Sequence, residues 1–424
     1  MKSHPSRLVD WQLSTLMAGA AFAAMIVTSA PAAAGTTWWV TNQGMDTASC
    51  GTRPKPCRSI SAAVEKALAG DVIEVGAGLY GDLNGDGAFT APGEEHFGTD
   101  NSRHHMTCII CVDKAIKILS LHGADDTIID AGNGRRADPT STDGVVNNVI
   151  SFGGSGATLG AEGAGFTITG SGGDGVHVQS TAASATIIGN IAQGNRGSGF
   201  AVEIVDASPP PFPVPLQTYV LKKNSSIHNA VGFLVSHDES RGIPELAYLV
   251  GNTAADNASD GFLASGRSFQ LQLIGNVSSH NGAGIHIGDG VFWEIRGNSL
   301  IGNLGPGILL WGVSEQLQIT GNTIVGNIGA GVYLVGATDN NVIRGNNIYG
   351  NTGAPLGTIP SVNPANCGVA NIDVQVPLDA TNNYWGSAAG PGADPADNAG
   401  LGCDFFGGKT IVKPFASTLF GISP

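Results

Sequence analysis

The densest group of residues that could transfer protons lies in the segment SHDESRGIPE, residues 236–245. It places His237, Asp238, Glu239 and Arg241 within five consecutive positions. An imidazole beside a carboxylate can supply the general base and acid of a lyase, an epimerase or a hydrolase, and an arginine can bind a sugar oxygen. The alternative is a solvated charged loop, because charged side chains are mostly exposed.

A second candidate site lies in DLNGDGAFTAPGEE, residues 82–95. Asp82, Asn84 and Asp86 stand at alternate positions before a glycine, a pattern that resembles the start of an EF-hand calcium loop. The spacing lets three oxygens converge while the glycine makes a sharp turn. The twelfth position is a glycine, and Glu94 follows one residue later. We expect either a Ca²⁺ site formed by these four residues or a plain Asp/Asn/Gly turn.

Histidines and cysteines offer further chemistry. The stretch of residues 96–111 holds His96, His104 and His105 beside two cysteines and could bind a transition metal. The pair in CIIC could be a redox or metal pair, but an even cysteine count in an exported chain favours disulfides. Sequential pairing is the simplest of the possible connectivities. The six cysteines are Cys50, Cys57, Cys108, Cys111, Cys367 and Cys403.

The N-terminus has the pattern of an export signal. Lys2 and Arg7 precede the apolar run LSTLMAGAAFAAMIV, and Ala32-x-Ala34 comes before Gly35. The apolar run is shorter than the ~20 residues that a membrane span needs. We therefore expect residues 1–34 to be a signal peptide, no membrane span, and a mature protein in the periplasm or outside the cell.

The charge of the chain limits its partners. Without the leader, 18 basic and 33 acidic residues remain, a formal net charge of −15. Nucleic acid is excluded as the expected partner, because phosphate binding needs a basic patch. A strongly anionic substrate would be repelled unless Ca²⁺ or a local basic patch intervened.

The elements that must position these groups follow from a repeat. Seven Asn-x4-Asn pairs occur, and the last four steps between first asparagines are 24, 22, 24 and 24 residues, a period typical of solenoids. A glycine follows most pairs after three or four residues. The pairs are Asn190/Asn195, Asn224/Asn229, Asn252/Asn257, Asn276/Asn281, Asn298/Asn303, Asn322/Asn327 and Asn346/Asn351.

Apolar residues alternate after each glycine, as in Phe233/Val235 and Ile308/Leu310, which indicates half-buried strands. One repeat cannot bury these side chains, but coils stacked at about 4.8 Å form a continuous core. With no segment of helical length inside a repeat, the sequence predicts an all-β, right-handed parallel β-helix. Stacked asparagines should form an amide ladder inside the turns, and the glycines should allow the corners.

The ends differ from the repeats. SISAAVEKALAG, residues 59–70, predicts an amphipathic helix that covers the N-terminal end of the solenoid. We expect one domain over residues 35–424, built from a cap and first coil (35–80), an inserted loop (82–111), coils (112–355) and a closing segment (356–424).

Two segments carry a family resemblance. GTRPKPCRSISAAVEKALAGDVIEVGAGLY resembles the opening of bacterial pectate-lyase-like β-helix proteins, and NNYWGSAAGPG resembles the segment that closes many of them. This superfamily includes polysaccharide lyases, glycoside hydrolases, uronate epimerases and the periplasmic protein that serves copper loading of nitrous oxide reductase. The resemblance implies the fold and leaves the activity open.

The segment around residues 231–265 is faintly similar to the catalytic coils of alginate C5-epimerases. The Asp-Pro-His-Glu motif of that family is absent, and Val231 replaces the expected tyrosine. Ala283-Gly284 replaces a His-Gly pair. The resemblance therefore does not by itself imply epimerase activity.

Stacking in register places residues two positions after the corner glycines in one outward row. His286 and Tyr333 fall in this row, and Trp311 falls in the next, so these three could form an aromatic platform for sugar rings. A loop that buries the same face is the alternative. With His237, Asp238, Asp260 and His286 for proton transfer, we expect a protein that binds, and could process, an extracellular polysaccharide. A non-catalytic exported scaffold is the rival hypothesis.

Overall fold

The structure is a computed structural model that describes residues 35–87, 89–100, 107–132, 148–153, 156–180, 184–204, 217–237, 245–267, 269–336, 340–352, 368–371, 377–391 and 410–421. Residues Gly35–Pro424 form one compact unit. The predicted signal peptide, residues 1–34, lies outside the described residues. No helix in the described part of the chain is long and apolar enough to cross a membrane.

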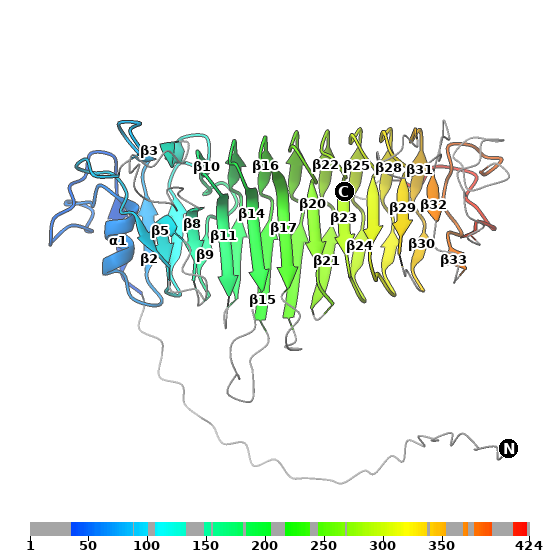
Figure 1. Cartoon of the computed structure of the whole chain (residues 1–424). Coiled ribbons are helices and arrows are strands. Elements are labelled where there is room, and N and C mark those ends of the chain that lie inside the picture. The colour runs from blue at the N-terminus through cyan, green and yellow to red at the C-terminus, as the bar shows by residue number, and fades with distance from the viewer. Residues whose placement is uncertain are drawn as a thin grey trace, which may run out of the picture. The chain divides into compact units, whose positions relative to one another are not determined.

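The described residues from Gly35 onward fold as a right-handed parallel β-helix with three long sheets (Figure 1). The 13-stranded sheet contains β1 (Thr37–Val40), β2 (Val72–Val75), β6 (Lys117–Ser120), β9 (Thr158–Leu159), β12 (Ala185–Ile188), β15 (Gln217–Lys222), β18 (Glu245–Val250), β21 (Gln270–Ile274), β24 (Glu294–Arg296), β27 (Gln318–Thr320), β30 (Val342–Arg344), β33 (Leu378–Asp379) and β34 (Thr410–Ile411). The 10-stranded sheet contains β3 (Gly78–Gly81), β7 (Thr127–Asp130), β10 (Thr167–Thr169), β13 (Ile191–Gln193), β16 (Ser225–Ile227), β19 (Thr253–Ala255), β22 (Val277–Ser279), β25 (Ser299–Ile301), β28 (Thr323–Val325) and β31 (Asn347–Tyr349). The 11-stranded sheet contains β4 (Gly98–Thr99), β5 (Thr107–Val112), β8 (Asn148–Phe152), β11 (Asp174–Ser180), β14 (Ser198–Ile204), β17 (Val231–His237), β20 (Phe262–Ser265), β23 (Ile285–Gly288), β26 (Ile308–Trp311), β29 (Val332–Val335) and β32 (Val369–Asn371).

Each coil of the central region adds one strand to every sheet, so strands that are neighbours in a sheet are three elements apart in the chain. The pairings are parallel, and the short strand β4 is the exception, because it runs antiparallel to β5. β5 begins at Thr107, inside the segment predicted as a loop insertion over residues 82–111. Cys108 and Cys111 therefore lie on a strand of the 11-stranded sheet.

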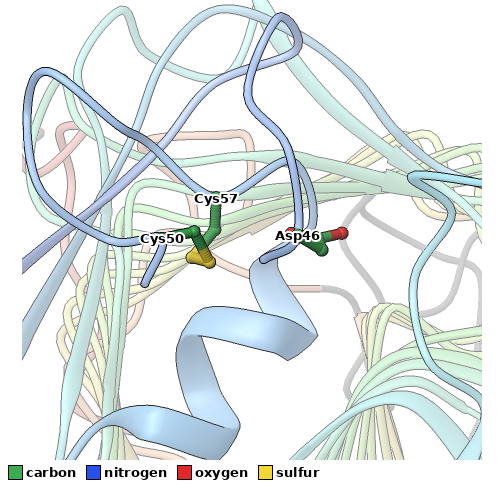
Figure 2. Close-up of side chains that lie close together, drawn as sticks. All are labelled: Asp46, Cys50 and Cys57. Carbon is green, nitrogen blue, oxygen red and sulfur yellow. A yellow bond between two sulfur atoms is a disulfide. The ribbon is translucent and has the colours of Figure 1, made fainter. Parts of the chain in front are cut away.

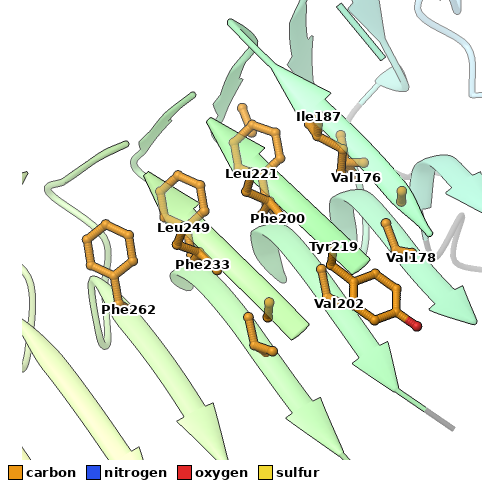
Figure 3. Close-up of a cluster of buried hydrophobic side chains, with 14 of the residues drawn as sticks. Val176, Val178, Ile187, Phe200, Val202, Tyr219, Leu221, Phe233, Leu249 and Phe262 are labelled. Atoms are coloured by element: carbon orange, nitrogen blue, oxygen red, sulfur yellow. The ribbon is translucent and has the colours of Figure 1, made fainter. Parts of the chain in front are cut away.

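The core is a column of apolar side chains that repeat from coil to coil. Phe200, Phe233 and Phe262 stack on one another, with ring centroids 5.1 and 4.9 Å apart (Figure 3). Most inward positions of β11 to β20 hold apolar residues, because alternate side chains on a strand point to opposite faces. Stacking equal side chains on successive coils fills the same space in each layer.

The predicted amide ladders are confirmed, and there are two of them. Asn322 illustrates the pattern: its Nδ2 donates to Ile295 O and to Asn346 Oδ1, both at 2.9 Å. Its own Oδ1 accepts from the backbone and side-chain amides of Asn298, also at 2.9 Å. One ladder runs from Asn190 through Asn346 and reaches Asn383, in the NNYWGS segment. The other runs from Asn195 to Asn351.

The predicted helix is shorter than its pattern suggested. It is α1 (Ile60–Lys66), with Ser59 as N-cap accepting from Ala62 N and Ala67 as C-cap. The apolar face of α1 joins the main core beside β1, β2 and β5. Lys114 Nζ donates to three carbonyls at the C-terminal end of α1, which satisfies groups that a helix end leaves unpaired.

Four of the predicted disulfide cysteines are bridged in sequential order, Cys50 to Cys57 and Cys108 to Cys111. Cys367 and Cys403 lie outside the described residues. Asp46 lies beside the first disulfide (Figure 2), and its carboxylate accepts from Arg58 N and Ser59 N. This Asp–Cys–Cys group is therefore structural, because sulfurs bonded to each other are not thiolate ligands.

Candidate functional site

The outer face of the 11-stranded sheet carries two rows of side chains that the strand register fixes. The first, which we call the outer row, holds residues two positions after each corner glycine. Their backbone pairings agree with the predicted register. The outer row is His177, Ala201, Leu234, Leu263, His286, Leu309 and Tyr333.

Asp260 and His286 form the pair that we call the open pair. Asp260 precedes the corner glycine of one coil, and His286 lies in the outer row of the next. The Nδ1 of His286 is 2.9 Å from Asp260 Oδ2, while Asp260 Oδ1 accepts from Ala283 N at 3.1 Å. Because a carboxylate only accepts, Nδ1 is the donor. The imidazole is thereby oriented with Nε2 as its basic atom, and 25% of the side chain is exposed.

Trp311 is the diagonal neighbour of His286, one coil further and two residues along, because His286 pairs with Leu309 and Gly288 pairs with Trp311. Strand spacings put the two Cα atoms roughly 8 Å apart. Half of Trp311 (52%) is exposed. An exposed indole beside an oriented imidazole is a surface on which a sugar ring can stack.

Tyr333 does not extend this surface. It is only 8% exposed and packs with Ala283, Leu309 and Ala370 in a small second apolar cluster. Burial raises the pKa of its phenol. Of the three predicted platform residues, the structure therefore presents His286 and Trp311 at the surface and buries Tyr333.

His237 lies on the other side of the sheet. Along β17 it alternates in phase with Phe233 and Val235, which are core residues, so it faces inward. Its Nε2 is 3.6 Å from Glu245 Oε2, and its ring stacks on Phe269. The structure therefore separates His237 from the open pair. Asp238, Glu239 and Arg241 lie outside the described residues.

A second Asp–His pair, Asp174 and His177, was missed in the sequence. We call it the closed pair, because His177 is only 1% exposed. His177 Nδ1 is 2.9 Å from Asp174 Oδ2, and Asp174 Oδ1 accepts from Ser198 N. Asp174 and Asp260 both precede a corner glycine, and both histidines lie in the outer row. Extending the repeat one coil before the first Asn-x4-Asn pair would have found it.

Three carboxylates surround the imidazole of the closed pair. Burial lowers the pKa of His177, but the hydrogen bond to Asp174 and the negative charges of Asp174, Glu203 and Asp100 outweigh it, so the pKa is raised. Glu203 Oε2 lies 3.7 Å from His177 Nε2 and accepts from Gln179 Nε2. Asp100 is buried and accepts from Ser151 Oγ.

The predicted calcium residues do come together. One carboxylate oxygen each from Asp82, Asp86 and Glu94 lie within 4.8 Å of one another. Asp82 accepts from Gly85 N and Gly87 N, so the loop turns around its carboxylate. Glu94 accepts from three backbone N–H groups, and the Asn84 side chain bonds to Asp86. Calcium binding at this loop stays a prediction, because these bonds also explain the cluster without an ion.

That prediction can be measured by thermal unfolding. If the loop binds Ca²⁺, an excess of 100 Kd should add about 2.7 kcal/mol to the free energy of unfolding and raise Tm. Asp82→Asn should remove the calcium-dependent rise, whereas Asp125→Asn, at an exposed acid elsewhere, should keep it. An equal Tm with and without Ca²⁺ would show the cluster to be a turn only.

Comparisons with known proteins concern more than half of the chain. A family model described as "Periplasmic copper-binding protein (NosD)" matches residues 119–327 and 248–365. A search of curated proteins found no match. Among solved structures, the A-module of mannuronan C-5 epimerase AlgE4 from Azotobacter vinelandii is 14% identical, with 84% of this chain and 94% of that chain covered and a TM-score of 0.51.

Two lyases are also similar in structure. A rhamnogalacturonan lyase is 14% identical over 74% of this chain and 75% of that chain, with a TM-score of 0.42. The pectate lyase Pel9A is 15% identical over 77% of this chain and 81% of that chain, with a TM-score of 0.40. At these identities the likeness concerns the fold.

Proposed function

The chain belongs to the periplasmic copper-binding protein (NosD) family, and from that premise we propose that it is a periplasmic β-helix protein that binds a polysaccharide across the outer face of the 11-stranded sheet. The observation that carries the proposal is the open pair, Asp260–His286, beside the exposed ring of Trp311. A glycan chain laid across the coils would meet an aromatic face and an oriented base together.

The open pair can also do chemistry on such a ligand. Asp260 holds His286 in one tautomer and would stabilise the imidazolium that forms when Nε2 takes a proton. A sugar ring stacked on Trp311 would place its ring hydrogens near that nitrogen. Proton abstraction next to a uronate carboxylate is the first step of both elimination and epimerisation. The net charge of −15 favours a neutral or weakly charged glycan unless a cation accompanies a polyuronate.

The family description names copper as a ligand. We therefore compare the donor atoms of the described residues with the ligands that copper prefers. Cu(I) prefers thiolates and thioethers. The four described cysteines are all in disulfides, and Met45 is the one methionine within the described ranges, so these residues supply no soft-donor set. Imidazole with carboxylate, which suits Cu(II) and Zn(II), is present at His177.

The experiment that tests glycan binding is a screen of the purified mature protein against polyuronates and neutral glycans. Binding is read by calorimetry, cleavage by reducing ends and elimination by the absorbance of unsaturated products. The proposal expects at least one glycan to bind with a Kd below about 1 mM, or about −4 kcal/mol. Failure of every glycan to bind or react would favour the non-catalytic scaffold.

Trp311→Ala should weaken that binding at least 10-fold, because stacking on an exposed indole supplies both area and the CH–π contact. Leu304→Ala removes an exposed apolar side chain from the same coil on a different surface and is the matched control. Calorimetric titration of both variants gives the comparison. Equal losses in the two would mean that Trp311 is not a sugar contact.

A further inference from the structure

The open and closed pairs share several features, although His177 lies in the same strand as Asp174 and His286 lies one coil after Asp260. In both, Asp Oδ1 accepts from the backbone of the next coil, and Oδ2 orients a histidine of the outer row. In both, the side chain one coil further and two residues along the sheet lies diagonal to the imidazole. That residue is Trp311 at the open pair and Glu203 at the closed pair.

We infer that the closed pair and Glu203 form a binding site for a divalent transition-metal ion, with His177 Nε2 and the Glu203 carboxylate as ligands and Asp174 as the positioning residue. This site goes beyond the glycan site, since four coils separate His177 from His286, about 19 Å at the strand spacing of a sheet.

The first support is an unpaired buried nitrogen. Nδ1 of His177 is used by Asp174, and Nε2 has no hydrogen-bond partner among the residues that the structure describes. With 1% of the side chain exposed, bulk water does not satisfy it. A buried polar atom left unpaired is energetically costly, so its position calls for a ligand.

The second support is the gap between the two ligand atoms. Nε2 and Glu203 Oε2 are 3.7 Å apart, too far for a hydrogen bond. A zinc-type ion bonds nitrogen and carboxylate oxygen at about 2.0–2.2 Å, which at a tetrahedral angle spans roughly 3.4 Å. A shift of a few tenths of an ångström would therefore let Nε2 of His177 and Oε2 of Glu203 bind the same ion.

The third support is the arrangement behind the ligand. Metal-binding histidines donate their other ring N–H to a carboxylate, which fixes the tautomer and the ring plane. Asp174 does this for His177, and its remaining oxygen is fixed by Ser198 N at 2.6 Å. Asp174, Glu203 and the nearby Asp100 make the surroundings acidic, which favours a cation.

The alternative to a metal ion on His177 Nε2 is a proton. A titration with Cu²⁺ distinguishes these two possibilities. Chelator-treated mature protein should bind one Cu²⁺ at pH 7.5, with nitrogen hyperfine splitting from one imidazole in the electron paramagnetic resonance spectrum. His177→Asn keeps a donor to Asp174 but removes Nε2, and should weaken binding at least 100-fold and abolish the splitting. Glu203→Gln should weaken it about 10–100-fold.

The matched control is His280→Asn. His280 is an exposed imidazole, 3.7 Å from Asp256 Oδ1, and its left-handed backbone suits asparagine. This variant should bind Cu²⁺ as the wild type does. Circular dichroism and Tm without metal check folding, and the partly exposed Glu203 supplies a second variant if His177→Asn does not fold.

Equal Cu²⁺ affinity in the wild type, His177→Asn and Glu203→Gln would overturn the inference. The inference would also be overturned if the imidazole of wild-type His177 kept its Nε2 proton in excess Cu²⁺. Glycan binding is measured in parallel and should be unchanged in Glu203→Gln, so failure of the glycan proposal and failure of the metal site are distinguishable.

Discussion

Asn322→Ala is expected to lower the free energy of unfolding by about 3–5 kcal/mol. The substitution leaves Ile295 O without its side-chain donor and removes the acceptor of two Asn298 amides. All of these groups are buried, so water does not replace the lost partners. Each orphaned group costs about 1–3 kcal/mol, and the ladder polarises its neighbours in addition. Urea unfolding followed by circular dichroism measures the change.

Gln318→Ala is the control for this prediction. Gln318 lies on β27 in the same coil and is exposed, so the change should stay within about 0.5 kcal/mol of the wild type. Because solenoid coils contact only their neighbours, the loss at Asn322 should show as earlier unfolding of the surrounding coils. Similar losses for both variants would mean that the ladder is not the source of stability.

His286→Asn is expected to lower the rate of product formation from any glycan that the wild type converts by about 10²–10⁴-fold. Asparagine keeps a donor toward Asp260 Oδ2 but has no basic nitrogen at the place of Nε2. Substrate binding should change by only a few fold, because Trp311 and the sheet face remain. Steady-state kinetics should therefore show a loss in kcat with little change in KM.

His228→Asn serves as the control for the loss of an imidazole. His228 is exposed, lies in a turn after β16 and has a left-handed backbone that suits asparagine. Its kinetics should match the wild type. Retention of full kcat in His286→Asn would exclude the open pair as the base and would leave the face as a binding surface alone.

The two pairs suggest how one β-helix can hold different sites. Both carboxylates precede a corner glycine and both imidazoles lie in the outer row, but the histidine comes from the same coil in one pair and from the next coil in the other, and the diagonal residue also differs. An indole there offers a ring face, and a carboxylate offers a ligand atom. This is consistent with the general rule that a fold does not fix activity.

The sequence by itself determined the fold, the ladders and the outer row. These depend on local rules that repeat with the period: alternate side chains face opposite ways, asparagine suits the turn, and stacking copies each position onto the next coil. His286 and Trp311 could therefore be placed on one face before any coordinates, whereas the disulfide pairs Cys50–Cys57 and Cys108–Cys111 were fixed only by the structure.

Only the tertiary structure decided which polar residues meet. His237 is close to several charged residues in sequence. Its side chain nevertheless points into the interior beside Glu245, because it lies an even number of positions from the core residues of β17. Asp260 and His286 are 26 residues apart in the chain. Their side chains meet because the chain makes one turn of the β-helix between them and so brings them onto adjacent coils. Tyr333 is buried among Ala283, Leu309 and Ala370 of neighbouring coils, and His177 lies among Asp174, Glu203 and Asp100, so their burial depends on which side chains the neighbouring coils carry.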